Sequence, residues 1–291
     1  MAARARRHHG STVESRIVAD RRANLAFAQG LTRAFAGAVI FGVPLLMTME
    51  MWWLAFHMSA VRLALLIALF FPFLVALSWH VGFEPTFSLV DDMLDALVAY
   101  LVGFVASLLV LLLLGALGPG EGLREILGKV SLQAVPASIG ALLSQSQLGQ
   151  SEAQAQVRGG REGYFSELFI MAVGALFLAF NVAPTEEILI IALRLGGAQV
   201  LLLAVATLVV MHAFVYSADF RGQPPDHHKA PAWSVFLRFT VVGYAIALAL
   251  SAFLLWTFGR LDGSSVPVAL STVAVLAFPA AVGAAAARLI L

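Results

Sequence analysis

Two acidic motifs of the form Thr-x-Glu stand within long apolar stretches of this sequence. The first consists of Thr48 and Glu50, and the second of Thr185 and Glu187. Glu186 adds another carboxylate to the second motif. Carboxylate oxygens are ligands that hard cations prefer, and a carboxylate can also exchange a proton. The motifs therefore predict either cation binding or proton transfer.

Each shared glutamate is followed seven positions later by a basic or titratable residue. His57 follows Glu50, and Arg194 follows Glu187. Seven residues make two helical turns, so the two members of a pair lie on one face of a helix. We expect an ion-binding or proton-exchange site that consists of Thr48, Glu50, His57, Thr185, Glu186, Glu187 and Arg194.

The same residues also fit a structural explanation. Thr185 follows Pro184 and would cap a helix that begins at Glu186. Acidic side chains in a first helical turn are stabilised by the helix dipole, by about 0.3–1 kcal/mol. Both explanations place Glu50 and Glu187 near the outer membrane face. There we expect their side chains to point into the protein, because an ionised carboxylate at the lipid face costs several kcal/mol.

The composition is that of a polytopic membrane protein. Hydrophobic residues make up 60% of the chain and charged residues only 12%, whereas soluble domains average about 25% charged residues. The absence of cysteine excludes disulfides and thiolate metal sites. The sequence lacks a Gly-rich phosphate loop, an HExxH motif and a Gly-x-Ser-x-Gly elbow. We therefore expect no enzyme activity, no cofactor and no nucleic-acid partner.

About 20 apolar residues cross a bilayer. Seven stretches qualify clearly, namely 31–49, 61–80, 92–117, 164–183, 188–217, 234–258 and 266–289. The stretch 123–147 is less apolar. Counting it as a span, with both termini in the cytoplasm, places most Lys and Arg residues on the cytoplasmic side, as the positive-inside rule requires. Seven spans would divide these residues about evenly between the two sides, so the sequence predicts eight.

Two apolar runs are too long for a single span. The runs 51–80 and 188–217 each have about 30 residues, which is roughly 45 Å of helix against a hydrocarbon core of about 30 Å. Each run contains an interruption, at Ser59 in one and at Gly196-Gly197 in the other. A short segment followed by a full span is therefore expected in both places.

The two halves of the chain resemble each other. A shift of 137 residues pairs Gly37 with Gly174, and it also pairs the two Thr-x-Glu motifs. A shift of 144 pairs Gly115 with Gly259, and a shift of 143 pairs "VPASIGA" (135–141) with "FPAAVGA" (278–284). This order predicts a duplicated four-helix unit. Because four spans is an even number, both copies would insert in the same orientation, as parallel repeats about an axis along the membrane normal.

The repeat divides the chain into four parts. They are a basic cytoplasmic N-terminal segment (1–30), a first four-helix membrane repeat (31–147), a cytoplasmic linker (148–163) and a second four-helix membrane repeat (164–291). Two prolines, at equivalent positions in the two repeats, are expected to lie inside spans: Pro136 and Pro279.

Another acidic group lies at the start of the third span. Asp91, Asp92 and Asp95 occur in "VDDMLDALVAY", and the shift of 143 places Asp95 opposite Arg238. An Asp95–Arg238 salt bridge between the repeats and an inner mouth that attracts cations both fit this pattern. Two isolated titratable residues, Glu167 and His212, are expected to be satisfied by neighbouring helices.

The block "PTEEILIIALRLGG", together with the eight apolar spans, resembles an uncharacterised family of bacterial integral membrane proteins, a domain of unknown function. The resemblance extends from about Phe27 to the C-terminus. It implies a membrane protein and supplies no substrate or site.

The sequence thus predicts an all-α, polytopic membrane protein with eight transmembrane helices in two parallel four-helix repeats. The expected function is a channel or proton-coupled transporter for a small cation, with paired glutamates at the repeat interface. The alternative is a non-transporting membrane scaffold or assembly partner whose acidic residues are helix caps. We expect the bacterial inner membrane as location, the lipid bilayer and a small cation as partners, and association into a homo-oligomer.

Overall fold

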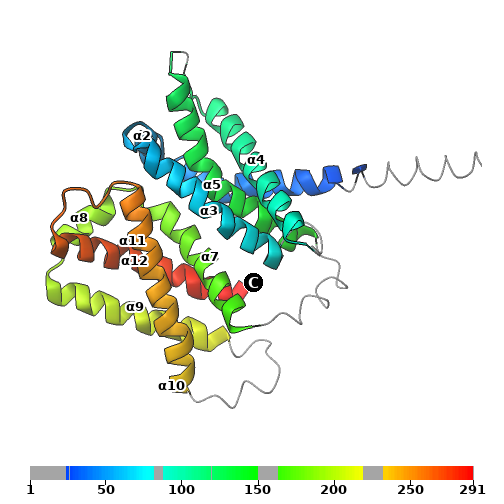
Figure 1. The fold of residues 1–291 in the computed structure, drawn as a ribbon. Helices are drawn as coiled ribbons and strands as arrows, with labels where there is room; N and C mark the ends of the chain where they lie inside the picture. Colours follow the sequence, from blue (N-terminus) through cyan, green and yellow to red (C-terminus); the bar gives the residue numbers. More distant parts are fainter. Residues whose placement is uncertain are drawn as a thin grey trace, which may run out of the picture.

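A computed structural model describes residues 24–25, 27–81, 88–118, 120–149, 163–218 and 232–290. The described residues form helices joined by turns (Figure 1), which confirms the all-α fold. Eight helices are long and apolar enough to cross a membrane, as predicted. They are Phe27–Leu46, Ala60–His80, Leu89–Leu113, Leu123–Ser144, Tyr164–Val182, Gly197–Phe214, Trp233–Thr257 and Val266–Arg288.

The first half begins with the span Phe27–Leu46, which is drawn in blue without a label in Figure 1. It continues with α2 (Met49–His57), α3 (Ala60–Val81), α4 (Leu89–Leu113) and α5 (Leu123–Gly149). The second half contains α7 (Tyr164–Val182), α8 (Glu187–Arg194), α9 (Gly197–Ala218) and α10 (Ala232–Val235). A π-helical turn (Phe236–Val241) leads from α10 into α11 (Val242–Thr257), and α12 (Val266–Ile290) ends the chain.

Both long apolar runs are broken where the sequence predicts. Met58 separates α2 from α3 and has extended backbone, and Leu195 does the same between α8 and α9. Polar side chains then cap the new helices. The Ser59 hydroxyl accepts a hydrogen bond from the Arg62 amide at 3.2 Å, and the side-chain oxygen Oε1 of Gln199 accepts one from the Gly196 amide at 2.7 Å. Each run therefore consists of a short helix and a full span.

The last helix of each half is its most buried span. In α5, 83% of the apolar segment is buried, and in α12 the value is 56%, whereas the other spans reach at most 39%. α5 packs against α2, α3 and α4, and α12 packs against α7, α8, α9 and α11. Because these neighbours shield α5 from lipid, it tolerates Lys129 and Gln133, and this shielding explains its low apolarity.

A contact between the halves supports eight spans rather than seven. Arg62 at the start of α3 binds Asp262 in the turn between α11 and α12. These two chain segments lie on one membrane face only if α5 crosses the bilayer. With seven spans they would lie on opposite faces, about 30 Å apart.

Tryptophans mark both ends of the spans. Trp52 and Trp53 on α2 and Trp256 at the end of α11 belong to one end, and Trp79 and Trp233 belong to the other. Trp53, Trp79, Trp233 and Trp256 are exposed. Tryptophan is enriched at membrane–water interfaces, so this arrangement fits the two boundaries of a bilayer.

Aromatic rings pair with one another across the contact between the two halves. Side chains of the first span and α3 meet side chains of α7, with ring centroids about 5–6 Å apart. The pairs are Phe41–Phe177, Phe70–Phe180, Phe73–Phe169 and His80–Phe169. Such ring pairs combine a large buried apolar area with favourable edge and offset geometry.

Glycine allows the closest helix contacts, at matching places in both halves. A methyl group at Gly37 would collide with the carbonyl oxygen of Gly140, and one at Gly174 would collide with that of Gly283. The repeat alignment pairs Gly37 with Gly174 and Gly140 with Gly283, so the two contacts occupy equivalent positions. Pro136 and Pro279 lie inside α5 and α12, as expected.

The turns that end α4 and α11 also match. Gly115 (φ 67°) and Gly259 (φ 71°) adopt left-handed backbone there. The amide of Ala116 then binds the carbonyl of Leu111 at 2.9 Å, and the amide of Arg260 binds the carbonyl of Leu255 at 2.8 Å. α4 therefore stops at Leu113, before the predicted end at residue 117. The rotation that relates the two halves as parallel repeats stays a prediction.

We predict that Gly283→Leu destabilises the protein, because its side chain must enter the backbone contact with Gly174. Overpacking of this kind costs about 1–3 kcal/mol. The measurement is thermal unfolding in detergent, with Gly197→Ala as control because no atom lies within 4 Å of a methyl group there. Equal melting temperatures for the two variants would contradict the role of the glycine contact.

Candidate functional site

The threonines of the two motifs close the helices that precede them. The Thr48 hydroxyl donates to the carbonyl of Pro44, and the Thr185 hydroxyl donates to the carbonyl of Val182 at 2.9 Å. The expectation that Thr185 caps a helix beginning at Glu186 is therefore wrong, since α8 begins at Glu187. Each hydroxyl binds a carbonyl in the last turn of the preceding helix. The Val182 carbonyl also accepts the Thr185 amide, at 3.1 Å.

The glutamates lie at the starts of the short helices. Glu50 is half-buried in the first turn of α2, whereas Glu187 is exposed in the first turn of α8 and Glu186 is exposed just before it. The expected interior orientation is thus wrong for Glu187. The cavity described below is lined by neither Glu50 nor Glu187, and their pairing remains a hypothesis.

His57 and Arg194 lie in the last turns of the same short helices, and both are exposed. The His57 Nδ1 atom is 3.0 Å from the carbonyl oxygen of Trp53, and the two rings stack at 5.6 Å. Each short helix thus has a carboxylate at its N-terminus and a basic group at its C-terminus. Both groups complement the helix dipole, which accounts for the seven-residue spacing without a ligand.

The aspartates at the start of α4 bind α3. The Ser78 hydroxyl lies 3.2 Å from Asp95 Oδ2 and 3.5 Å from Asp92 Oδ1, and Asp92 is buried. Asp91 is exposed, and its amide donates to the Ser88 hydroxyl that caps the helix.

Arg238 lies exposed on the π-helical turn before α11, and its carbonyl accepts a hydrogen bond from the Tyr164 hydroxyl. The predicted Asp95–Arg238 salt bridge is not among the ion pairs of the described residues. An inner mouth formed by Asp91, Asp92, Asp95 and Arg238 remains a hypothesis.

Two isolated titratable residues have partners on neighbouring helices, as predicted. Glu167 on α7 binds Arg288 on α12 at 2.9 Å, and the guanidinium also lies 4.0 Å from the ring of Phe239. The His212 Nδ1 atom lies 3.0 Å from the Thr240 hydroxyl. Both contacts join helices of the second half.

The sequence did not indicate the partner of Arg62. This residue binds Asp262 with two parallel hydrogen bonds of 2.6 and 2.8 Å, and its guanidinium lies 5.2 Å from the ring of Trp256. The hydrogen bonds from Arg62 lower the pKa of the Asp262 carboxyl below its ordinary value of 3.8, and partial desolvation opposes part of that shift. The two residues are 200 positions apart, so no local pattern could have paired them.

Lys129 forms a second contact that the sequence left unassigned. Its ammonium group is buried in α5 and donates to the Ala116 carbonyl and to Glu121, both at 2.7 Å. The ring of Phe56 lies 4.7 Å away. A buried charge is tolerated when it is paired and hydrogen-bonded. Lys129 therefore anchors the turn between α4 and α5.

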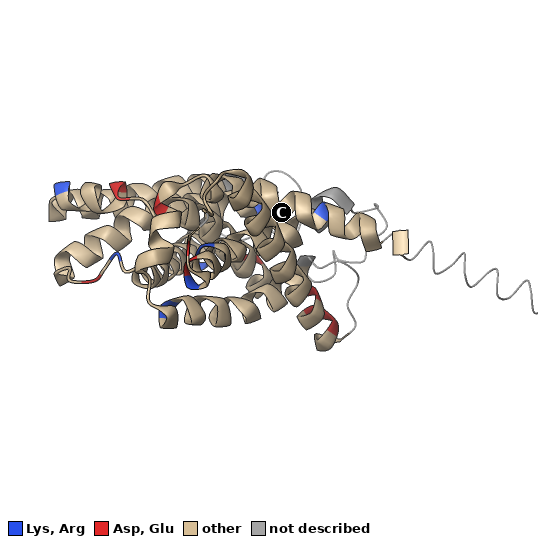
Figure 2. Cartoon of the chain, turned by 90° about the horizontal axis from the view of Figure 1, so that it is seen from above, with Lys and Arg blue, Asp and Glu red and all other residues tan. Residues whose placement is uncertain are grey.

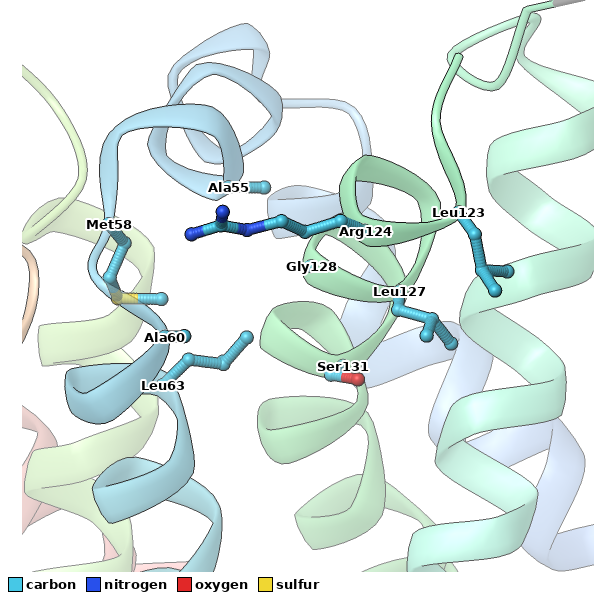
Figure 3. A pocket seen from close by; sticks show the side chains of 9 residues that line it. All are labelled: Ala55, Met58, Ala60, Leu63, Leu123, Arg124, Leu127, Gly128 and Ser131. Carbon is cyan, nitrogen blue, oxygen red and sulfur yellow. The ribbon is translucent and has the colours of Figure 1, made fainter.

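A cavity of about 390 Å³ lies between the α2–α3 corner and the start of α5 (Figure 3). It is lined by Ala55, Met58, Ala60, Leu63, Leu123, Arg124, Leu127, Gly128 and Ser131. None of the predicted ion-binding residues belongs to this lining. Among the described residues, no group of three or more His, Asp or Glu could hold a metal ion.

The chain matches a family model over residues 30–291, which is most of its length. It belongs to the DUF2391 family. The description of this family reads "Putative integral membrane protein (DUF2391)", and its function is unknown. No curated protein and no solved structure matches the chain. Membership in DUF2391 agrees with the eight spans. It also agrees with the paucity of charge along the helices, most of which are tan in Figure 2.

We predict that the Arg62–Asp262 contact stabilises this DUF2391 protein at neutral pH and is lost in acid. Because the pKa of Asp262 is lowered on folding, its contribution is complete above the ordinary carboxyl pKa and disappears as pH falls through the lowered value. Asp262→Asn should lower the melting temperature by about 2 °C or less at pH 7, since the pair is partly exposed.

The check is the difference in melting temperature between wild type and Asp262→Asn, measured from pH 7 to pH 3. That difference should be constant down to about pH 5 and then shrink. A difference in melting temperature that grows in acid would contradict stabilisation by the ionised Asp262 carboxylate.

Proposed function

We propose that this DUF2391 protein is a membrane scaffold that neither transports a substrate nor catalyses a reaction. The observation that carries this proposal is the contact between the halves, where aromatic rings of the first span, α3 and α7 pack against one another. A conduit needs polar groups and space along the interface between repeats. We further propose that it resides in the bacterial inner membrane with both termini in the cytoplasm, since this orientation follows the positive-inside rule.

The surface of α8 supports an assembly role. Apolar Ile190, Ile191 and Leu193 are exposed between the charges of Glu187 and Arg194. An apolar centre with charged residues around it has the composition of a protein interface. The occupant we propose is a second copy of this chain.

Passage of a small cation is the second candidate. The observation in its favour is the matched position of the two Thr-x-Glu motifs, each at the break between a long helix and a short one. Breaks in transmembrane helices often supply ion ligands in transporters. In this proposal Glu50 and Glu187 exchange protons or bind the cation, and Thr48 and Thr185 contribute hydroxyl oxygens.

We predict that proteoliposomes with the wild-type protein pass Na⁺, K⁺ and H⁺ no faster than empty liposomes between pH 5 and 8. The same assay should give an unchanged result for Glu50→Gln/Glu187→Gln. An ionophore added at the end shows that the gradients were intact. If the wild-type protein passes a cation faster than empty vesicles do, and this flux falls in the double variant, the scaffold proposal is wrong and cation passage takes its place.

We also predict that single cysteines will report self-association, since the chain has no cysteine of its own. Leu193→Cys should form a disulfide-linked dimer in membranes under mild oxidation, because this side chain is 62% exposed. Ala192→Cys is the matched control, because the neighbouring Ala192 is only 3% exposed. Absence of a dimer with Leu193→Cys, or equal yields for both variants, would contradict a homodimer through α8.

A further inference from the structure

The cavity beside α5 combines an apolar wall with one cationic side chain, that of Arg124. Met58, Ala60 and Leu63 from the α2–α3 corner line this cavity together with Leu127 and Ser131 of α5. In Figure 3 the Arg124 side chain extends from the start of α5 across this space toward the α2–α3 corner. The volume of about 390 Å³ lies within the range of small-molecule sites.

Arg124 differs from Arg62 and Lys129, which lie at the same end of the spans. Arg62 binds Asp262, and Lys129 binds Glu121. Arg124 is exposed and has no ion pair among the described residues. Its guanidinium group is therefore available to an anion from outside the chain, and its five donors suit a phosphate.

The cavity lies at an end of the spans. Its lining comes from the starts of α3 and α5, the same end of the spans as Trp53 and Trp256, and interfacial tryptophans mark the level of the lipid headgroups. An arginine side chain at the membrane boundary lies among lipid phosphates, and the apolar residues of the cavity that continue into the span lie beside acyl chains. Gly128 contributes to this shape, because a methyl group there would lie 3.2 Å from the Ala55 carbonyl oxygen and would force α2 away from α5.

We propose that this cavity binds one anionic phospholipid of the bilayer. Arg124 holds its phosphate, the Ser131 hydroxyl offers a further hydrogen bond, and one acyl chain lies over Met58, Leu63 and Leu127. A free phosphate would gain nothing from the apolar wall, whereas a lipid satisfies the charge and the wall together. This site is independent of the scaffold role and of the Thr-x-Glu motifs.

The test is lipid binding by the delipidated full-length protein in detergent, followed by native mass spectrometry. The probes are phosphatidylglycerol, phosphatidylcholine with the same acyl chains, and inorganic phosphate. Wild type should bind phosphatidylglycerol about tenfold more tightly than phosphatidylcholine, because the choline ammonium of the second lipid offsets the phosphate charge that Arg124 binds. Arg124→Gln should abolish this preference, and Arg124→Lys should retain part of it.

Two further variants separate this site from general electrostatics. Arg194→Gln removes an exposed arginine of α8, outside the cavity, and should leave the preference unchanged. Ala60→Leu keeps the Arg124 charge but fills the cavity, and should weaken binding of both lipids. Melting temperatures show that each variant is folded.

Three results would overturn the proposal. The first is an equal loss of preference in Arg124→Gln and Arg194→Gln, which would show that surface charge alone attracts the lipid. The second is unchanged lipid affinity in folded Ala60→Leu, which would place the acyl chain elsewhere. The third is competition by millimolar inorganic phosphate, which would indicate an anion site without a lipid chain.

Discussion

The close backbone contact between the first and last span of each half is the interaction on which the structure depends. Gly37 meets Gly140, and Gly174 meets Gly283, at distances that exclude any side chain. In a membrane, helices gain little from hydrophobic association, so close van der Waals packing between small residues holds them together. This contact places α5 and α12 at the centres of their halves, and the remaining spans pack around them and face lipid.

Shielding of α5 has consequences for its chemistry. A helix surrounded by other helices can carry groups that lipid would reject, and α5 carries the buried Lys129 together with Gln133. At the same membrane boundary Arg62 joins the halves through Asp262, while Arg124 faces a cavity. These three basic residues therefore differ in role. Lys129 anchors a turn, Arg62 joins the halves, and Arg124 is available to an external anion.

The short helices α2 and α8 show how a repeated motif can arise from structure alone. An acid at the start and a base at the end stabilise an isolated helix of two turns, and a threonine hydroxyl satisfies the helix before it. This explanation requires no transported ion. The aromatic contact between the halves favours the same view, and flux measurements decide whether Glu50 and Glu187 have a second role.

Hydrophobicity and length were sufficient to predict the all-α membrane fold, the eight spans and the breaks near Ser59 and Gly196. These features depend on local composition and on the thickness of a bilayer, both of which can be read along the chain. The repeat alignment also identified glycines that the structure places in contact. The sequence did not predict that Arg62 binds Asp262 or that Glu187 is exposed. Such contacts depend on how the helices rotate and pack in three dimensions, and only the tertiary structure determines that.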